Sequence, residues 1–543
     1  MSATVSAYLN IYQIFPVEST RTNILGVLIA LASISIVFQA LWYRRALQAV
    51  NYIPGLRVPF HPFSGPGAVI PTTWWNPGLS FMWKWRRSMY AYYGCDTISL
   101  VPFFVGPATL YTSNLDVVRQ VIGSSGGKKF HKSKASLTGQ IVLRWGMNIF
   151  VANTHVWRKH RRIMGPAFTS ILYEVVWAET LKTYREMVAE EGWSTQDRIS
   201  IPAVQSLTFK LALLIIGKCG FGFQFSWAEP ARTADGRMAV QEALRISADS
   251  FKVSLFVPWW IKILPFKRFK EVAEATTELL AFMQTQVAER KADIRARGSA
   301  GNDAFSMLVK ASENEEVKYR MDDSEIIGNV FIMLFAGHET TARSLSATIG
   351  FLALYDDLQE EIYQQIMSVV GQERDPVYQD YIKLNKVLAA FLETLRIFPP
   401  AYFMVREAFE DTVLRVPTGE EGATAVPVPK GTVVIVDMIG IQYNPRYFDD
   451  PEEYRPSRWY EVAHEPEAFY AFSNGPRQCI GHKFATTEAV CFLTMLLKDY
   501  KMEPVMKKGE TKEQWKKRVL SAKLGLTLGV EDVPVDFVRR KNI

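Results

Sequence analysis

A charge-free apolar stretch lies near the N-terminus. Residues 23–43 contain no charged side chain, and at about 1.5 Å per residue they would span about 30 Å as a helix, one hydrocarbon thickness. Trp42 and Tyr43 end the stretch and two arginines follow, whereas residues 1–20 contain no lysine or arginine. This distribution predicts one membrane-spanning helix with the following chain in the cytosol. The alternatives are a cleaved signal peptide, whose apolar core is normally shorter, and a buried core helix, which normally keeps a polar face.

Prolines then punctuate residues 53–67, and proline fixes an extended, non-helical path. The pattern predicts a stiff linker between the membrane helix and a globular body. We therefore expect four parts: a short lumenal N-terminus (1–22), a transmembrane anchor (23–43), a basic and proline-rich linker (44–67) and one large domain (68–543).

A second predicted helix, from Asp322 to about Tyr355, carries apolar side chains on all sides and should cross the interior of that domain. Asp322 offers an N-cap and a favourable charge at its start. Polar groups nonetheless interrupt it at Ala336-Gly337-His338-Glu339-Thr340-Thr341. A buried glycine, glutamate and hydroxyls are locally unfavourable, and such conflicts tend to mark functional sites. Taken alone, a kinked core helix with satisfied polar groups explains this segment equally well.

The remaining pattern predicts a mainly helical domain with small β-sheets. Residues 165–300 are rich in predicted helix, and Leu388–Phe398 and His482 to about Asp499 predict two more helices. Apolar positions at Leu524–Leu528 suit strands. Residues 68–150 resolve only into irregular structure, short helices and some strand.

Composition narrows the class of protein. The chain has 543 residues, 48% of them apolar, so it can bury a large core. A formal charge of +7 is small and scattered, and no nucleic-acid motif is recognised. Its four cysteines have no paired spacing, which excludes a disulfide scaffold or a structural zinc site and predicts a reducing compartment.

Candidate chemistry concentrates in Phe472–Gly481, which reads Phe-Ser-Asn-Gly-Pro-Arg-Gln-Cys-Ile-Gly. Gly475 and Gly481 permit backbone angles or close approaches that a β-carbon forbids. Between them stands Cys479, with Arg477 two residues before it. The arrangement suits a cysteine held against a large flat cofactor, with a cation for the acidic groups of that cofactor. The alternative is a buried free cysteine at a turn.

The full spacing Phe-x-x-Gly-x-Arg-x-Cys-x-Gly resembles the heme-binding signature of the cytochrome P450 family at every defining position. The resemblance implies the cytochrome P450 fold and heme b (iron protoporphyrin IX) as cofactor. It also implies that Cys479 is the axial thiolate ligand of the heme iron, that Phe472 packs beside the heme and that Arg477 meets a heme propionate.

Other segments resemble further parts of the same family. Trp157 and Arg161 lie four apart on one predicted helix face and match a Trp-x-x-x-Arg that contacts heme propionates, and Arg406 matches another propionate arginine. Their basic neighbours Arg158, Lys159 and Arg162 are expected to point outward, toward an acidic electron donor. The segment around Glu339 resembles the oxygen-activation motif, which implies catalytic roles for Thr340 and Glu339 in delivering protons.

A structural ion cluster is also implied. Glu393 and Arg396 are three apart on one helix face and resemble the family's Glu-x-x-Arg pair, and Arg458 resembles its third member. Burying these charges costs desolvation, so we expect the cluster to fix the geometry of the cysteine loop. One departure from the family is Gln442, which stands where a histidine is common, and we expect only a local change in hydrogen bonding.

By family position, the substrate pocket would include apolar residues on two segments, Phe335, Ala336, Ala401, Tyr402 and Phe403. A further stretch, residues 256–266, carries two adjacent tryptophans between prolines. It is either core or a loop that touches the membrane over the substrate entrance.

The resemblance implies a microsomal heme-thiolate monooxygenase, with residues 68–543 as its catalytic domain. It would insert one oxygen atom from O2 into an apolar small molecule, by hydroxylation or epoxidation. Because no flavin or nicotinamide domain is recognised after the heme loop, electrons are expected from NADPH through a separate flavoprotein reductase, with a b-type cytochrome as a further donor. The expected location is the endoplasmic reticulum membrane, in contact with lipid, with a single span and a cytosolic catalytic domain.

Two alternatives stay open. One is a heme-thiolate isomerase or peroxygenase that needs no reductase, although intact Glu339 and Thr340 argue against it. The other is a non-catalytic heme-binding protein.

Overall fold

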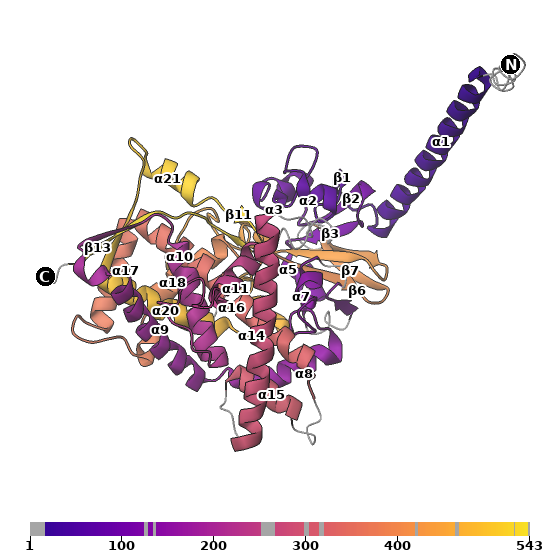
Figure 1. Ribbon diagram of the computed structural model, residues 1–543. Coiled ribbons are helices and arrows are strands. Elements are labelled where there is room, and N and C mark those ends of the chain that lie inside the picture. Colours follow the sequence, from indigo (N-terminus) through magenta and orange to yellow (C-terminus); the bar gives the residue numbers. More distant parts are fainter. Residues whose placement is uncertain are drawn as a thin grey trace, which may run out of the picture.

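The structure of the protein is a computed structural model, and it describes residues 17–123, 129–133, 137–250, 266–297, 303–313, 320–418, 422–461, 466–525 and 527–540. Figure 1 shows one long helix, α1, projecting from a body of helices and small sheets. Strands β1, β2 and β3 lie on the side of the body from which α1 emerges, and helices α9, α17 and α20 lie on the other side (Figure 1).

Helix α1 is longer than the stretch that predicts it. It runs Val17–Ala49, since arginine is a good helix former and the arginine pair does not interrupt it. Its segment Leu25–Ala49 has a mean hydropathy of 2.2 in a window with no buried residue, so among the described residues one helix is long and apolar enough to cross a membrane. Near its C-terminal end α1 joins the body: Tyr43 stacks on Phe103 with ring centroids 4.7 Å apart, and Val50 is fully buried.

The proline-rich stretch is not a free linker throughout. Residues Gly55–Phe60 form β1, which pairs in parallel with β2 (Thr97–Val105), and Gly65–Val69 form the short helix α2. Close packing requires the glycine at 55, because a Cβ there would lie 1.9 Å from the carbonyl oxygen of Ser99. From Gly55 onward, the stretch predicted as linker is therefore part of the body.

Among the described residues, the strands of the body form four small sheets. In the largest, the strand order is β1-β2-β3-β9-β6-β4. Strand β6, which follows the Glu-x-x-Arg helix, therefore belongs to the same sheet as the N-terminal strands. The strands of this sheet after β2 are β3 (Thr109–Thr112), β4 (Phe130–His131), β6 (Phe403–Ala408) and β9 (Val433–Asp437). The other sheets are β10-β13-β5 (Tyr500–Pro504, Val535–Arg539, Arg198–Ile201), β11-β12 (Lys523–Leu524, Leu528–Gly529) and β7-β8 (Thr412–Thr418, Gly422–Val428).

Helices make up most of the body. The structure confirms a mainly helical fold with small sheets. The helices after α2 are α3 (Phe81–Lys84), α4 (Met89–Tyr93), α5 (Leu115–Ile122), α7 (Leu137–Leu143), α8 (Thr154–Met164), α9 (Ser170–Glu190), α10 (Gln205–Ile215), α11 (Val240–Asp249), α14 (Lys267–Arg297), α15 (Ala304–Glu313), α16 (Asp323–Leu354), α17 (Asp356–Val369), α18 (Asn385–Ile397), α19 (Met438–Gln442), α20 (His482–Asp499) and α21 (Lys512–Val519).

The predicted interior helix is α16. Asp322 caps it in a capping box with Glu325, as the acidic start of the helix predicts, and most of its residues are buried. Helix α20 begins and ends where the sequence predicts, and α18 begins three residues before the predicted Leu388. Helices α16, α18 and α20 pack against one another, and α20 begins directly after the cysteine loop.

Candidate active site

The cysteine loop is a tight turn between Phe472 and α20. The Cys479 N–H donates to the carbonyl oxygen of Phe472 at 2.8 Å, and Gly475–Arg477 form one 3-10 turn inside the loop. Gly475 has a φ of +77°, and a Cβ there would lie 3.0 Å from the carbonyl oxygen of Ile122. Glycine is therefore required for the loop to pass this close to α5.

Cys479 is accessible to solvent rather than buried. Its side chain is exposed, unlike the buried Cys219 and Cys491. The surrounding protein nevertheless removes enough water to raise the pKa of the thiol, while the Gly481 N–H and the guanidinium of Arg161 lower it. An exposed thiol inside such a loop is chemically available as a ligand, and deprotonation would follow from a metal ion bound to the sulfur.

Three cations gather beside the loop. Arg477 donates through Nη2 to the carbonyl oxygen of Ala152 at 2.7 Å, whereas its Nη1 is buried and has no hydrogen-bond partner among the described residues. Burial lowers the pKa of Arg406 to about 10, and burial together with Arg406 lowers the pKa of Arg477 to about 10. Burial and these two arginines also lower the pKa of Lys132 well below its usual value. An anion would stabilise such a cluster, and the two propionate groups of heme are anions of this kind.

Helix α8 lies beside the cysteine loop and Arg477. The Arg477 guanidinium lies 4.9 Å from the ring centroid of Trp157, and Arg161 Nη1 donates to the carbonyl oxygen of Gln478 at 3.4 Å. The structure thus brings Trp157, Arg161 and Arg477 together. Lys159 was expected to point outward, toward an electron donor. Its Nζ instead lies 2.7 Å from Glu325 Oε2 and joins α8 to the start of α16.

Lys132 is the cation that the sequence did not single out. It stands alone in the loop after β4, with no spacing to another motif, so no pattern pointed to it.

Phe472 behaves as a packing residue, because its ring stacks on His482 with centroids 3.9 Å apart and an interplanar angle of 20°.

The polar segment of α16 has three separate environments. Gly337 faces Ile216, and a Cβ there would lie 2.9 Å from Ile216 Cγ1, so the glycine serves close helix packing within a continuous helix. The Thr340 hydroxyl donates to the carbonyl oxygen of Ala336 at 2.8 Å. Glu339 is 1% exposed and accepts from Arg343 and Thr527.

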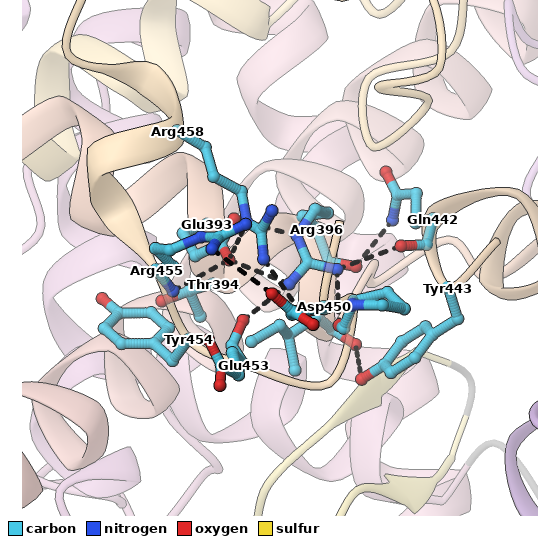
Figure 2. A network of polar contacts seen from close by, with 12 residues as sticks. Glu393, Thr394, Arg396, Gln442, Tyr443, Asp450, Glu453, Tyr454, Arg455 and Arg458 are labelled. Atoms are coloured by element: carbon cyan, nitrogen blue, oxygen red, sulfur yellow. Dashed lines mark hydrogen bonds and ion pairs between the residues drawn. The ribbon is translucent and has the colours of Figure 1, made fainter. Parts of the chain in front are cut away.

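The ion cluster forms as its spacing predicts and is fully buried at its centre (Figure 2). Arg396 is bidentate to Glu393, with N–O distances of 2.9 and 2.8 Å, and Arg458 Nε lies 3.2 Å from Glu393 Oε1. The remaining Arg396 donors reach three carbonyl oxygens, those of Gln442, Pro451 and Glu453. The cluster therefore fastens α18 to the segment that precedes the cysteine loop.

Gln442 has a larger part than the sequence indicated. It is fully buried, and its Nε2 donates to the carbonyl oxygens of Arg396 at 2.9 Å and Leu395 at 3.3 Å. Its Oε1 accepts from the N–H of Tyr470 at 3.2 Å, two residues before the loop. One side chain thus joins the end of α18 to the entrance of the cysteine loop.

The expected pocket residues lie on α16 and at the start of β6. Phe335 stacks on Phe331 with centroids 5.7 Å apart, whereas Ala336, the next residue of this buried helix, is exposed. Tyr402 is buried and meets Phe403 edge-on at 4.7 Å. Ala401 is exposed. Of residues 256–266, all but the exposed Phe266 fall outside the described residues.

An exposed cysteine, a cluster of buried and half-buried cations beside it and an interior helix that carries an acid match what a heme-thiolate oxidoreductase requires. The chain belongs to the cytochrome P450 family: the family model for cytochrome P450 matches residues 72–529. Its activity is accordingly that of a heme-thiolate monooxygenase.

Relatives and solved structures agree. The chain is 33% identical over 527 residues to cytochrome P450 monooxygenase 124 of Postia placenta, which covers 95% of this chain and all of the relative. It is 25% identical over 494 residues to a cytochrome P450 monooxygenase of Arthrobotrys oligospora, covering 80% of this chain and 83% of the relative. The crystal structure of the cytochrome P450DA heme domain has the same fold, with a TM-score of 0.71 and 20% identity over 90% of this chain and 98% of that one.

Proposed function

We propose that the protein is a membrane-anchored monooxygenase that inserts one oxygen atom from O2 into an apolar small molecule, with electrons from NADPH delivered by a separate flavoprotein reductase. The observation that carries the proposal is the cluster of the buried Arg406 with the half-buried Lys132 and Arg477, beside the exposed Cys479. This arrangement favours a flat, dianionic cofactor with a metal ion over any other ligand for the loop.

In this proposal the chain holds the cofactor from three sides. Cys479 would hold the heme iron through its sulfur. Trp157, Arg161, Arg406 and Arg477, together with Lys132, would hold the propionates, and Phe472 would pack beside the ring. Bound heme supplies the binding and activation of O2, and the thiolate increases the electron density that this chemistry needs.

The remaining roles belong to α16 and to the ion cluster. Glu339 and the Thr340 hydroxyl hold and pass the protons that oxygen reduction consumes. Phe335, Ala336, Ala401, Tyr402 and Phe403 exclude water around an apolar substrate. Glu393, Arg396 and Arg458 fix the loop that carries Cys479.

Exposed positive charge and the apolar helix α1 support the proposed electron supply and location. Arg158 and Arg162 are exposed on α8, next to Arg161 and the loop, and present positive charge to an acidic donor. The proposed donors are an NADPH-dependent flavoprotein reductase and a b-type cytochrome. Helix α1 is the proposed anchor in the endoplasmic reticulum membrane, with the body on the cytosolic side and in contact with lipid.

Two measurements test the proposal. Reduction under carbon monoxide should give the heme absorption band characteristic of thiolate ligation, and Cys479→His should abolish that band; a histidine-type spectrum in the unaltered protein contradicts the proposal. Membranes holding the protein and a reductase are then incubated with a panel comprising a long-chain fatty acid, a sterol, a sesquiterpene and a polycyclic aromatic hydrocarbon. An oxygenated product that requires NADPH and reductase is expected, and turnover that persists without them contradicts the proposed electron supply.

A further inference from the structure

The C-terminal tail holds the acid of α16. Glu339 Oε1 accepts from the Thr527 hydroxyl at 2.8 Å and from Arg343 Nε at 3.1 Å. Thr527 belongs to the turn between β11 and β12, and 188 positions along the chain separate it from Glu339. A long-range contact to a buried carboxylate is not needed to form a two-stranded hairpin, so its use must be sought at Glu339.

The two oxygens of this carboxylate are treated differently. Oε1 has both donors, whereas Oε2 is buried and has no hydrogen-bond partner among the described residues. A buried oxygen without a donor is unfavourable, and its persistence in a functional helix indicates that it is reserved for another partner. Two donors on one oxygen also fix the rotation of the carboxylate, and therefore the direction of the other oxygen.

The hairpin is shaped around Arg343. The Arg343 guanidinium lies 5.6 Å from the ring centroid of Phe209 on α10, and the stem of the side chain passes Gly529 of β12. A Cβ at Gly529 would lie 3.0 Å from Arg343 Cδ, tighter than most contacts of this kind. Glycine at 529 thus leaves room for the stem of Arg343, and the ring of Phe209 flanks the guanidinium whose Nε donates to Glu339.

The same hairpin is fastened to the expected pocket. The Leu528 N–H donates to the carbonyl oxygen of Pro400 at 3.0 Å, one residue before Ala401. Residues 527 and 528 therefore link the acid of α16 to the segment that leads into β6.

We propose that Arg343 and Thr527 are positioning residues that orient the Glu339 carboxylate, and that the β11–β12 hairpin thereby ties this acid to the segment beside the substrate. The inference rests on the proposed function, in which Glu339 passes protons. Arg343 and Thr527 themselves contact neither substrate nor heme in this proposal.

The first test measures the contact without turnover. Amide hydrogen exchange of the peptide covering residues 523–529 is compared in holoprotein carrying Thr527→Val, Glu339→Leu or both, each checked by its carbon monoxide spectrum. Each single change should raise the exchange rate roughly two- to tenfold, the effect of one lost hydrogen bond, and the double variant should show no further rise. Thr527→Ser keeps the donor and serves as the conservative variant. Lys523→Met removes an exposed ion pair with Glu531 on the same hairpin and should change nothing at Glu339. Unchanged exchange in Thr527→Val, or additive effects, would overturn the proposal.

The second test separates this inference from the proposed function. Hydrogen peroxide released per NADPH is measured with the panel compound that the unaltered protein oxygenates fastest. Peroxide release should rise severalfold in Glu339→Gln, and to a similar extent in Thr527→Val and Arg343→Gln, with recovery in Thr527→Ser. If Glu339→Gln has no effect, the proton-passing role in the proposed function fails. If Glu339→Gln raises the release but Thr527→Val and Arg343→Gln do not, the positioning role fails and the proposed function stands.

Discussion

At the scale of single residues, the pKa values of Lys132, Arg406 and Arg477 are lowered by burial, and those of Lys132 and Arg477 also by neighbouring cations. Each cation is destabilised by burial or by its neighbours, which lowers its pKa, and each would regain that free energy when an anion arrives. The cluster thus lowers the stability of the heme-free protein and raises its affinity for the cofactor.

Lys132→Met should therefore have opposite effects on the two forms. Lys132 is half-buried beside two arginines that disfavour its charge, so its removal should stabilise the heme-free protein by about 1–2 kcal/mol and speed heme loss roughly tenfold. Heme transfer to a globin acceptor and thermal unfolding of both forms measure these effects. Lys218→Met is a suitable control, because Lys218 pairs with Glu186 at 3.4 Å and its loss should only destabilise. Equal heme loss from Lys132→Met and the unaltered protein would contradict a cofactor role for Lys132.

Asp437, at the end of β9, predicts a pH dependence. Burial raises its pKa to about 7, against the Gly440 N–H and the Tyr90 hydroxyl, which donate to it. The folded protein then binds this proton more tightly than the unfolded chain, so this contribution to stability is present below about pH 4 and is lost as the pH rises to about 7. The loss is on the order of 2–4 kcal/mol.

Asp437→Asn should flatten this part of the stability profile and leave the variant more stable than the unaltered protein at pH 8. Unfolding midpoints between pH 4.5 and 8 measure it. Asp235→Asn, at an exposed carboxyl whose pKa is lowered to about 2 by Thr233 and Arg237, should leave the profile in this range unchanged. An unaltered slope in Asp437→Asn would exclude Asp437 as the source.

At the scale of elements, the connection between α18 and the cysteine loop decides the geometry of the site. Arg396 joins Glu393 to three backbone carbonyl oxygens (Figure 2). Gln442 joins the last turn of α18 to Tyr470. Breaking a buried ion pair costs about 3–5 kcal/mol because a charge is left unpaired. The loop therefore depends on hydrogen bonds made outside it.

Gln442→Leu tests this dependence. Losing three buried hydrogen bonds should cost about 2–4 kcal/mol, and the thiolate-type carbon monoxide band should disappear at a lower temperature than the protein unfolds. Gln359→Leu is matched to it, since Gln359 is also buried and bridges Leu352 and Met502 through three hydrogen bonds. That variant should lose similar stability with no separate loss of the band. The same early loss in both variants would argue against a special link through Gln442.

The elements also show what sequence reasoning is able to predict. Motifs with fixed spacing, such as Glu393 with Arg396, are local, so the pairing was predictable from one helix face. Lys132 and Gln442 act through contacts with residues far away in the chain, and no local pattern reveals such contacts. The proline-rich stretch was mistaken for a linker because strand pairing between β1 and β2 is likewise non-local.

At the scale of the whole molecule, α1 and the body share a packed junction. Tyr43 stacks on Phe103, and Ala46 and Val50 are buried. Removing residues 1–42 should release the protein from membranes and keep its stability, because the junction survives. Removing residues 1–50 should in addition cost about 2–4 kcal/mol of unfolding free energy. Membrane flotation and thermal unfolding distinguish the two variants, and equal stability would show that the junction contributes nothing.

The same junction attaches helix α1 rigidly to the body. With α1 in a bilayer, as proposed, a helix longer than the local hydrocarbon thickness responds by tilting. Because Tyr43 and Val50 join α1 to the body without an intervening flexible hinge, the body would turn through the same angle. Bilayer thickness would then set which surface of the enzyme faces the lipid, and so govern the path by which a dissolved apolar compound reaches it.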